Sequence, residues 1–115
     1  MTIELDAFVK LATEYWRLLK LAERAANDMQ SPKMASVVAQ IRYSTSRLQA
    51  ICQEGGLRLL AYDRQPYEPN LPVTVSNAEE AAEFGDAIVV RTLEPTIIAD
   101  GQVVAMGKVL LKRRV

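Results

Sequence analysis

The chain has 115 residues, with 14 basic and 14 acidic side chains, one cysteine and no histidine. A net charge of zero gives no global field that would draw the chain to nucleic acid or to an anionic membrane, so we expect a protein partner. Strictly apolar runs reach only about four residues, against the ~20 of a membrane helix, and the N-terminus lacks a signal-peptide pattern. These features predict a small, soluble, cytoplasmic protein.

An active site is hard to build from these residue types. Without histidine, neither a Ser/His/Asp nor a Cys/His nucleophile arrangement can form in the chain. Cys52 falls on an apolar helical face, where a buried structural thiol is expected rather than a reactive one. No glycine-rich phosphate loop is present, and the acidic residues of segment 79–86 match no calcium-loop spacing. We therefore expect no catalytic residues, no cofactor and no metal.

The first 30 residues carry a heptad pattern. Apolar residues recur at alternating three- and four-residue spacing without an intervening proline or glycine, which predicts a helix that packs on other helices. Flanking columns make the apolar surface wider than one stripe. The seam comprises Leu5, Phe8, Ala12, Tyr15, Leu19, Ala22, Ala26 and Met29, and the flanking columns comprise Val9, Leu11, Trp16, Leu18 and Ala25.

A second helix is predicted from Ser31 to Gly55. Ser31 and Pro32 have the pattern of an N-cap followed by proline at the first helical position, and Gly55-Gly56 stops the helix. Its apolar face comprises Met34, Val38, Ile41, Thr45, Leu48 and Cys52.

The length of the first helix favours association. A helix over residues 4–29 is roughly 39 Å long, whereas a compact chain of about 100 residues has a radius of gyration near 13 Å. We predict a homodimer held by a four-helix bundle, while an intramolecular hairpin that covers its second apolar face with the rest of the chain is the alternative. The predicted interface residues are Phe8, Tyr15, Leu19, Ala22, Ile41 and Leu48.

The second half of the chain has β character, so the fold class is α+β, with a helical dimerisation region over 1–55 and a small antiparallel β domain over 56–115. Strands are predicted at 57–62, 73–75, 86–93 and 107–112, and a hairpin turns at Asp100-Gly101. Segment 76–84 is either one or two helical turns capped by Ser76 and Glu79, or a solvated loop. Basic residues at 108–114 lie among aliphatic strand residues, a pattern more typical of a protected sheet edge than of a nucleic-acid site.

The connector at 65–71, with the sequence Gln-Pro-Tyr-Glu-Pro-Asn-Leu, carries the most specific signal. Pro66 and Pro69 fix φ and remove two backbone donors, so the segment is expected to be rigid. A Q-P-[FY]-[DE]-P-N-L segment after a helical hairpin resembles the bacterial GrpE nucleotide exchange factors. The stretch 15–26 resembles the helix that enters the GrpE dimer bundle, and 89–111 aligns without gaps to the family's last strands.

The resemblance implies a non-enzymatic co-chaperone that binds the ATPase domain of an Hsp70-type (DnaK-like) protein and promotes ADP release. It implies partner contacts at Leu93, Gln102, Met106 and Leu111. Gln102 stands where the family usually has a basic residue, and Pro95-Thr96-Ile97 replaces a K-G-Y corner, so we expect an apolar surface at this corner and a shifted partner choice. The alternatives are a dimeric adaptor of the same fold serving another ATPase or protein partner, and then a nucleic-acid-binding dimer.

Overall fold

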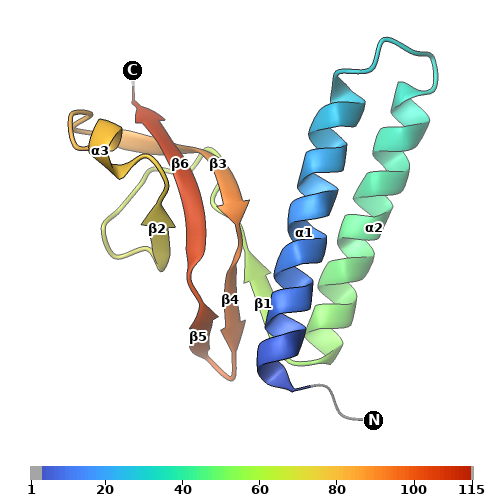
Figure 1. The fold of residues 1–115 in the computed structure, drawn as a ribbon, viewed down its shortest axis with the longest axis horizontal. Coiled ribbons are helices and arrows are strands. Elements are labelled where there is room, and N and C mark those ends of the chain that lie inside the picture. The colour runs from blue at the N-terminus through green and yellow to red at the C-terminus, as the bar shows by residue number, and fades with distance from the viewer. Residues whose placement is uncertain (1–3, 115) are drawn as a thin grey trace. The chain divides into compact units, whose positions relative to one another are not determined.

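Residues 4–114, the part of the chain that the computed structural model describes, form three helices and six strands. The chain divides between Arg58 and Leu59 into a helical unit and a β unit. This arrangement confirms the predicted α+β class with an N-terminal helix hairpin (Figure 1). Among the described residues, no helix combines the length and the apolar character needed to cross a bilayer.

Helices α1 (Leu5–Asn27) and α2 (Met34–Glu54) pack against each other as an antiparallel hairpin (Figure 1). At the open end of the hairpin, Gly55 permits a close approach, because a Cβ atom at this position would collide with the ring of Phe8. Gly56 follows with a φ of 85°, a left-handed conformation typical of a residue that ends a helix. The buried side chains are Val9, Ala12, Trp16, Leu19 and Ala26 on α1, and Val38, Leu48 and Cys52 on α2.

The start of α2 differs from the prediction. Ser31 Oγ accepts a hydrogen bond from the Lys33 N–H at 3.1 Å, and the Ser31 carbonyl accepts one from the Met34 N–H at 3.1 Å. Residues 31–33 therefore form a turn of their own, and regular helix begins at Met34 rather than at Pro32. The serine does satisfy a backbone donor, but this donor belongs to the turn.

The six strands form two small sheets. Strands β1 (Leu57–Leu60), β4 (Thr96–Ala99) and β5 (Gln102–Ala105) form one sheet in the order β1-β4-β5. Strands β2 (Val73–Val75), β6 (Gly107–Arg113) and β3 (Ala87–Glu94) form the other in the order β2-β6-β3. The predicted purely antiparallel unit is wrong in one respect, because β2 runs parallel to β6, with Val73 opposite Gly107.

The parallel pair follows from the position of β6 between β2 and β3, because β6 is antiparallel to β3 and parallel to β2. The crossover from β2 to β3 contains the single-turn helix α3 (Ala78–Ala81) and leads the chain to the opposite edge of β6. The predicted Ser76/Glu79 capping box does not form, since Asn77 is the N-cap residue and its side chain makes no capping bond. Instead, the Asn77 amide donates to the Leu111 carbonyl at 2.8 Å and accepts from the Leu111 N–H at 3.0 Å. This exchange fixes the crossover to β6.

Arg64 and the connector that follows it lie along the free side of β3. The Arg64 N–H donates to the Val89 carbonyl at 2.8 Å, the Val89 N–H donates to the Gln65 carbonyl at 2.9 Å, and the Tyr67 N–H donates to the Ala87 carbonyl at 2.9 Å. An antiparallel bridge pairs Pro66 with Ile88. The proline-rich segment thus forms a short fourth row of this sheet. The core beneath it comprises Tyr62, Val73, Ala87, Val89, Val109 and Leu111.

Candidate protein-binding surfaces

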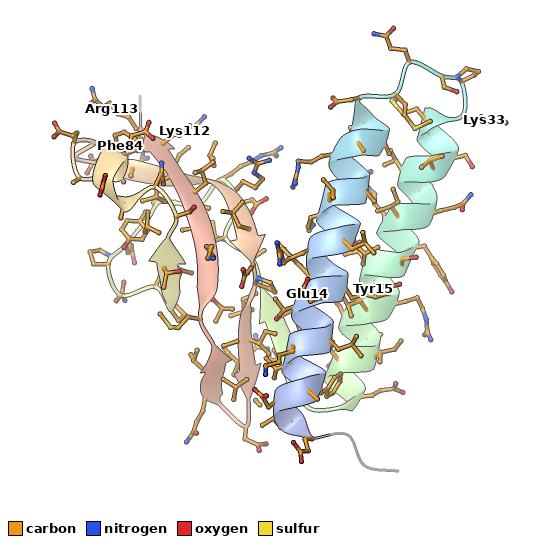
Figure 2. All side chains as sticks on the ribbon, in the orientation of Figure 1. Glu14, Tyr15, Lys33, Phe84, Lys112 and Arg113 are labelled. Carbon is orange, nitrogen blue, oxygen red and sulfur yellow. The ribbon has the colours of Figure 1, made fainter. Side chains whose placement is uncertain are left out.

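A row of large apolar side chains on α1 remains exposed after the hairpin has formed. Leu11, Tyr15 and Leu18 are 61%, 44% and 62% exposed and follow one another at four- and three-residue spacing, so they share one face of the helix. We call this row the α1 strip; Figure 2 marks Tyr15 within it. Exposed apolar residues in a contiguous row, unlike scattered ones, are typical of an interaction surface.

The structure divides the predicted interface residues into three groups by exposure. Leu19 and Leu48 are buried within the chain, Phe8, Ala22 and Ile41 are half-buried, and Tyr15 is exposed. The exposed face is instead completed by Leu11 and Leu18, which the sequence pattern places in a flanking column. The cause is the width of the apolar surface: a pattern that covers two adjacent seams does not say which seam the chain itself covers.

A second exposed surface lies on the β4–β5 hairpin. Asp100 and Gly101 have φ values of 52° and 74°, as expected for a tight two-residue hairpin turn, which confirms the predicted position of the turn. Strand β5 lies at an edge of its sheet, and a register shift opposite Ile97 and Ile98 interrupts its pairing with β4. The exposed side chains of this surface, which we call the β5 surface, are Gln102, Val103, Val104 and Met106.

Hydrogen bonds to one carbonyl group set the direction of this hairpin. The chain passes from the β2-β6-β3 sheet into the other sheet at Pro95 and returns at Met106. At this junction, Thr96 Oγ1 and the Gly107 N–H both donate to the Pro72 carbonyl, at 2.8 and 3.0 Å. A Cβ on Gly107 would lie 2.7 Å from Thr96 Oγ1 and 3.0 Å from the Thr96 nitrogen, so only glycine fits. The position of the β5 surface therefore depends on this packed junction.

Two of the four predicted partner-contact residues belong to the β5 surface. Gln102 is exposed at the start of β5, and Met106, just after it, is 51% exposed. Leu93 is half-buried in β3, and Leu111 is buried in the core, so its side chain offers no outward surface.

The predicted apolar surface at residues 95–97 is wrong. Pro95, Thr96 and Ile97 are all buried, because this corner is the passage between the two sheets. Sequence reasoning also missed Val103 and Val104 as surface residues. Their position directly after an Asp-Gly turn was an available signal, since a short strand there is easily left at a sheet edge.

The remaining chemistry of the described residues is sparse. Cys52 lies in α2 and is 1% exposed, and its burial raises the pKa of the thiol above the ordinary value of 9.0. Residues 4–114 bring no three cysteine, aspartate or glutamate side chains together in a way that could hold a metal ion. No family model, no curated protein and no solved structure matches this chain.

Proposed function

We propose that this chain is a GrpE-like co-chaperone that binds the ATPase domain of an Hsp70-type (DnaK-like) chaperone and promotes ADP release. In this proposal the helical unit forms a homodimer through the α1 strip, and the β5 surface contacts the ATPase domain. The chain performs no bond chemistry of its own. It accelerates release by binding the open nucleotide cleft more tightly than the closed one, and each 1.4 kcal/mol of differential affinity shifts the population about tenfold.

The observation that carries the proposal is the exposure of Gln102, at the start of the edge strand β5, and of Met106, directly after this strand. These are positions to which the sequence resemblance assigns partner contact, and Val103 and Val104 extend the same exposed surface. Soluble proteins usually protect an apolar edge strand, so an unprotected one favours contact with another protein. The connector supports the proposal independently. The segment that resembles the family is also the segment whose backbone pairs with β3.

The proposal is tested by the release of a fluorescent ADP analogue from an Hsp70-type ATPase of the same source. We expect wild-type protein to accelerate release and Met106→Glu to abolish the acceleration, because a carboxylate would be desolvated in the contact. Lys33→Glu, which changes an exposed residue in the turn between α1 and α2, is the matched control and should behave as wild type. Absence of acceleration at saturating wild-type protein would rule out the exchange function.

A dimeric adaptor that serves another ATPase is the second candidate, and Gln102 favours it. A neutral side chain is exposed at the position where the family usually presents a cation, which removes one charge-assisted contact with a standard partner. An adaptor would bind its ATPase through the same surface without changing the ADP release rate. Titration of binding alongside release therefore distinguishes the two candidates.

A further inference from the structure

A basic pocket lies on the β unit. None of its lining residues belongs to the β5 surface. Its volume is about 470 Å³, and it is bounded by the connector, β3 and the end of β6. The lining residues are Arg64, Pro66, Ile88, Lys112, Arg113 and Arg114, so four of the six are cationic and none is acidic.

Backbone pairing brings these residues together from three segments. Pro66 pairs with Ile88, and Ile88 pairs with Lys112, so the three residues form one row across neighbouring strands. Adjacent strands lie about 4.8 Å apart, which keeps the row narrow. Arg64 adopts a left-handed conformation with a φ of 68°, and its N–H is held by the Val89 carbonyl at 2.8 Å. The arginine is thus fixed beside the row by a backbone turn that is uncommon for a residue with a side chain.

The charges of the pocket are largely unneutralised within the described part of the chain. The four ion pairs found among residues 4–114 use Lys10, Arg17, Arg42 and Lys108, and none of the pocket cations. Arg113 is held in place by a hydrogen bond to the Glu83 carbonyl at 3.2 Å and by the ring of Phe84, 5.9 Å away; Figure 2 shows it beside Phe84 and Lys112 at the end of β6. Neither contact removes its charge.

The chemistry of the lining favours a phosphate group. The guanidinium groups of arginine match the oxygens of phosphate in a two-pronged geometry, and lysine adds a compact charge. The whole chain has no net charge, so the positive charge of this pocket is a local excess. A bound anion would reduce the repulsion between its cations. Pro66 and Ile88 supply an apolar part, and the volume exceeds that needed for one phosphate group and lies in the usual range of small-molecule sites.

We propose that this pocket binds a small phosphate-bearing anion, either inorganic pyrophosphate or a mononucleotide, through Arg64, Lys112 and Arg114. A nucleic-acid strand is disfavoured, because the cations gather in one pocket rather than along a track and no aromatic side chain lines it for base stacking. The site is independent of the proposed exchange function, since it uses none of the residues of the β5 surface.

Isothermal titration of the full chain with pyrophosphate and with ADP, at constant ionic strength and with sulfate as the reference anion, tests the proposal. We expect saturable binding of pyrophosphate or ADP and weaker binding of sulfate. Equal affinity for both ligands identifies the phosphates as the ligand, whereas binding of ADP alone identifies a nucleotide; both outcomes support the site. The double variant Arg64→Gln/Lys112→Gln changes exposed side chains and should reduce the affinity at least tenfold.

Lys108→Gln is the matched control, because Lys108 lies on the same strand but pairs with Glu94 at 3.6 Å and is not part of the pocket. It should leave the affinity unchanged. The proposal is overturned if neither ligand binds at millimolar concentration, if sulfate binds equally well, if the double variant binds like wild type, or if only a nucleic acid binds. Amide chemical shifts recorded during the titration should move at Ile88 and Lys112, and unchanged shifts there would also refute the site.

Discussion

Two neighbouring leucines on α1 separate association from folding. Leu18 is 62% exposed, whereas Leu19 is 9% exposed, because consecutive residues of a helix point about 100° apart. Replacing each in turn by lysine introduces the same charge at adjacent positions of the same helix. If the α1 strip is a dimer interface, Leu18→Lys weakens association, and Leu19→Lys weakens folding.

The effect of Leu18→Lys follows from its exposed fraction. Complete burial of a leucine side chain contributes about 1.5–3 kcal/mol, so covering the exposed 62% in a dimer contributes about 1–2 kcal/mol per copy. A symmetric dimer contains the residue twice, which gives about 2–4 kcal/mol and raises the dissociation constant roughly 30- to 1,000-fold. Desolvation of the introduced ammonium groups increases the loss further.

Leu19→Lys is expected to lower the stability of the folded chain rather than its association. This side chain is already buried in the single chain, so its truncation alone costs about 2–5 kcal/mol of folding stability, and the buried charge adds to this. Such a loss is a large fraction of the roughly 5–15 kcal/mol that stabilises a typical small domain. We therefore expect partial or complete unfolding of this variant.

Light scattering and sedimentation at micromolar concentration, together with far-ultraviolet circular dichroism, distinguish the two outcomes. We expect a dimer mass for wild type, a monomer mass with retained helicity for Leu18→Lys, and reduced helicity for Leu19→Lys. Met106→Lys, an exposed apolar-to-charged change on the β unit, is the control and should retain the dimer mass. A monomeric wild-type protein, or a Leu18→Lys variant with unchanged association, would refute the role assigned to the α1 strip.

Four further outcomes are expected. Gly107→Ala should lower the free energy of unfolding by about 1–3 kcal/mol in urea titration, because its Cβ would contact Thr96; an unchanged midpoint would contradict the packed junction. Thr92→Val should cost about 1–3 kcal/mol, since Thr92 Oγ1 accepts the Tyr62 N–H at 2.9 Å in a buried site, and a loss below about 0.5 kcal/mol would show that this bond is dispensable. The Cys52 thiol, whose pKa is raised by burial, should react with a disulfide reagent at pH 8 at least ~10-fold more slowly in the native protein than in denaturant, and equal rates would place it at the surface. Gln102→Arg should raise the affinity for a housekeeping Hsp70-type ATPase roughly tenfold without changing the mass of the assembly, and an unchanged affinity would exclude this position from partner choice.

Local sequence determined most of the secondary structure. The segment Val73–Val75 and the Asp100-Gly101 turn were predicted at their observed positions, since β-branched residues and residues that tolerate positive φ act through their own backbone. The end of the second helix at Gly55 was equally local. Composition alone shows that no site in this chain can use a histidine side chain.

Tertiary structure decided which residues became surface. Whether Leu18 or Leu19 faces outward depends on the packing of the chain around α1, and a doubly wide apolar pattern fits either answer. Pro95 is buried because the two sheets meet there. The Asn77 side chain makes no capping bond to α3 and instead donates a hydrogen bond to the carbonyl of Leu111, 34 residues away. The basic pocket likewise requires pairing between the connector, β3 and β6. Contacts between residues this far apart in the chain produce no periodic pattern in the amino-acid sequence. Only the folded structure therefore reveals them.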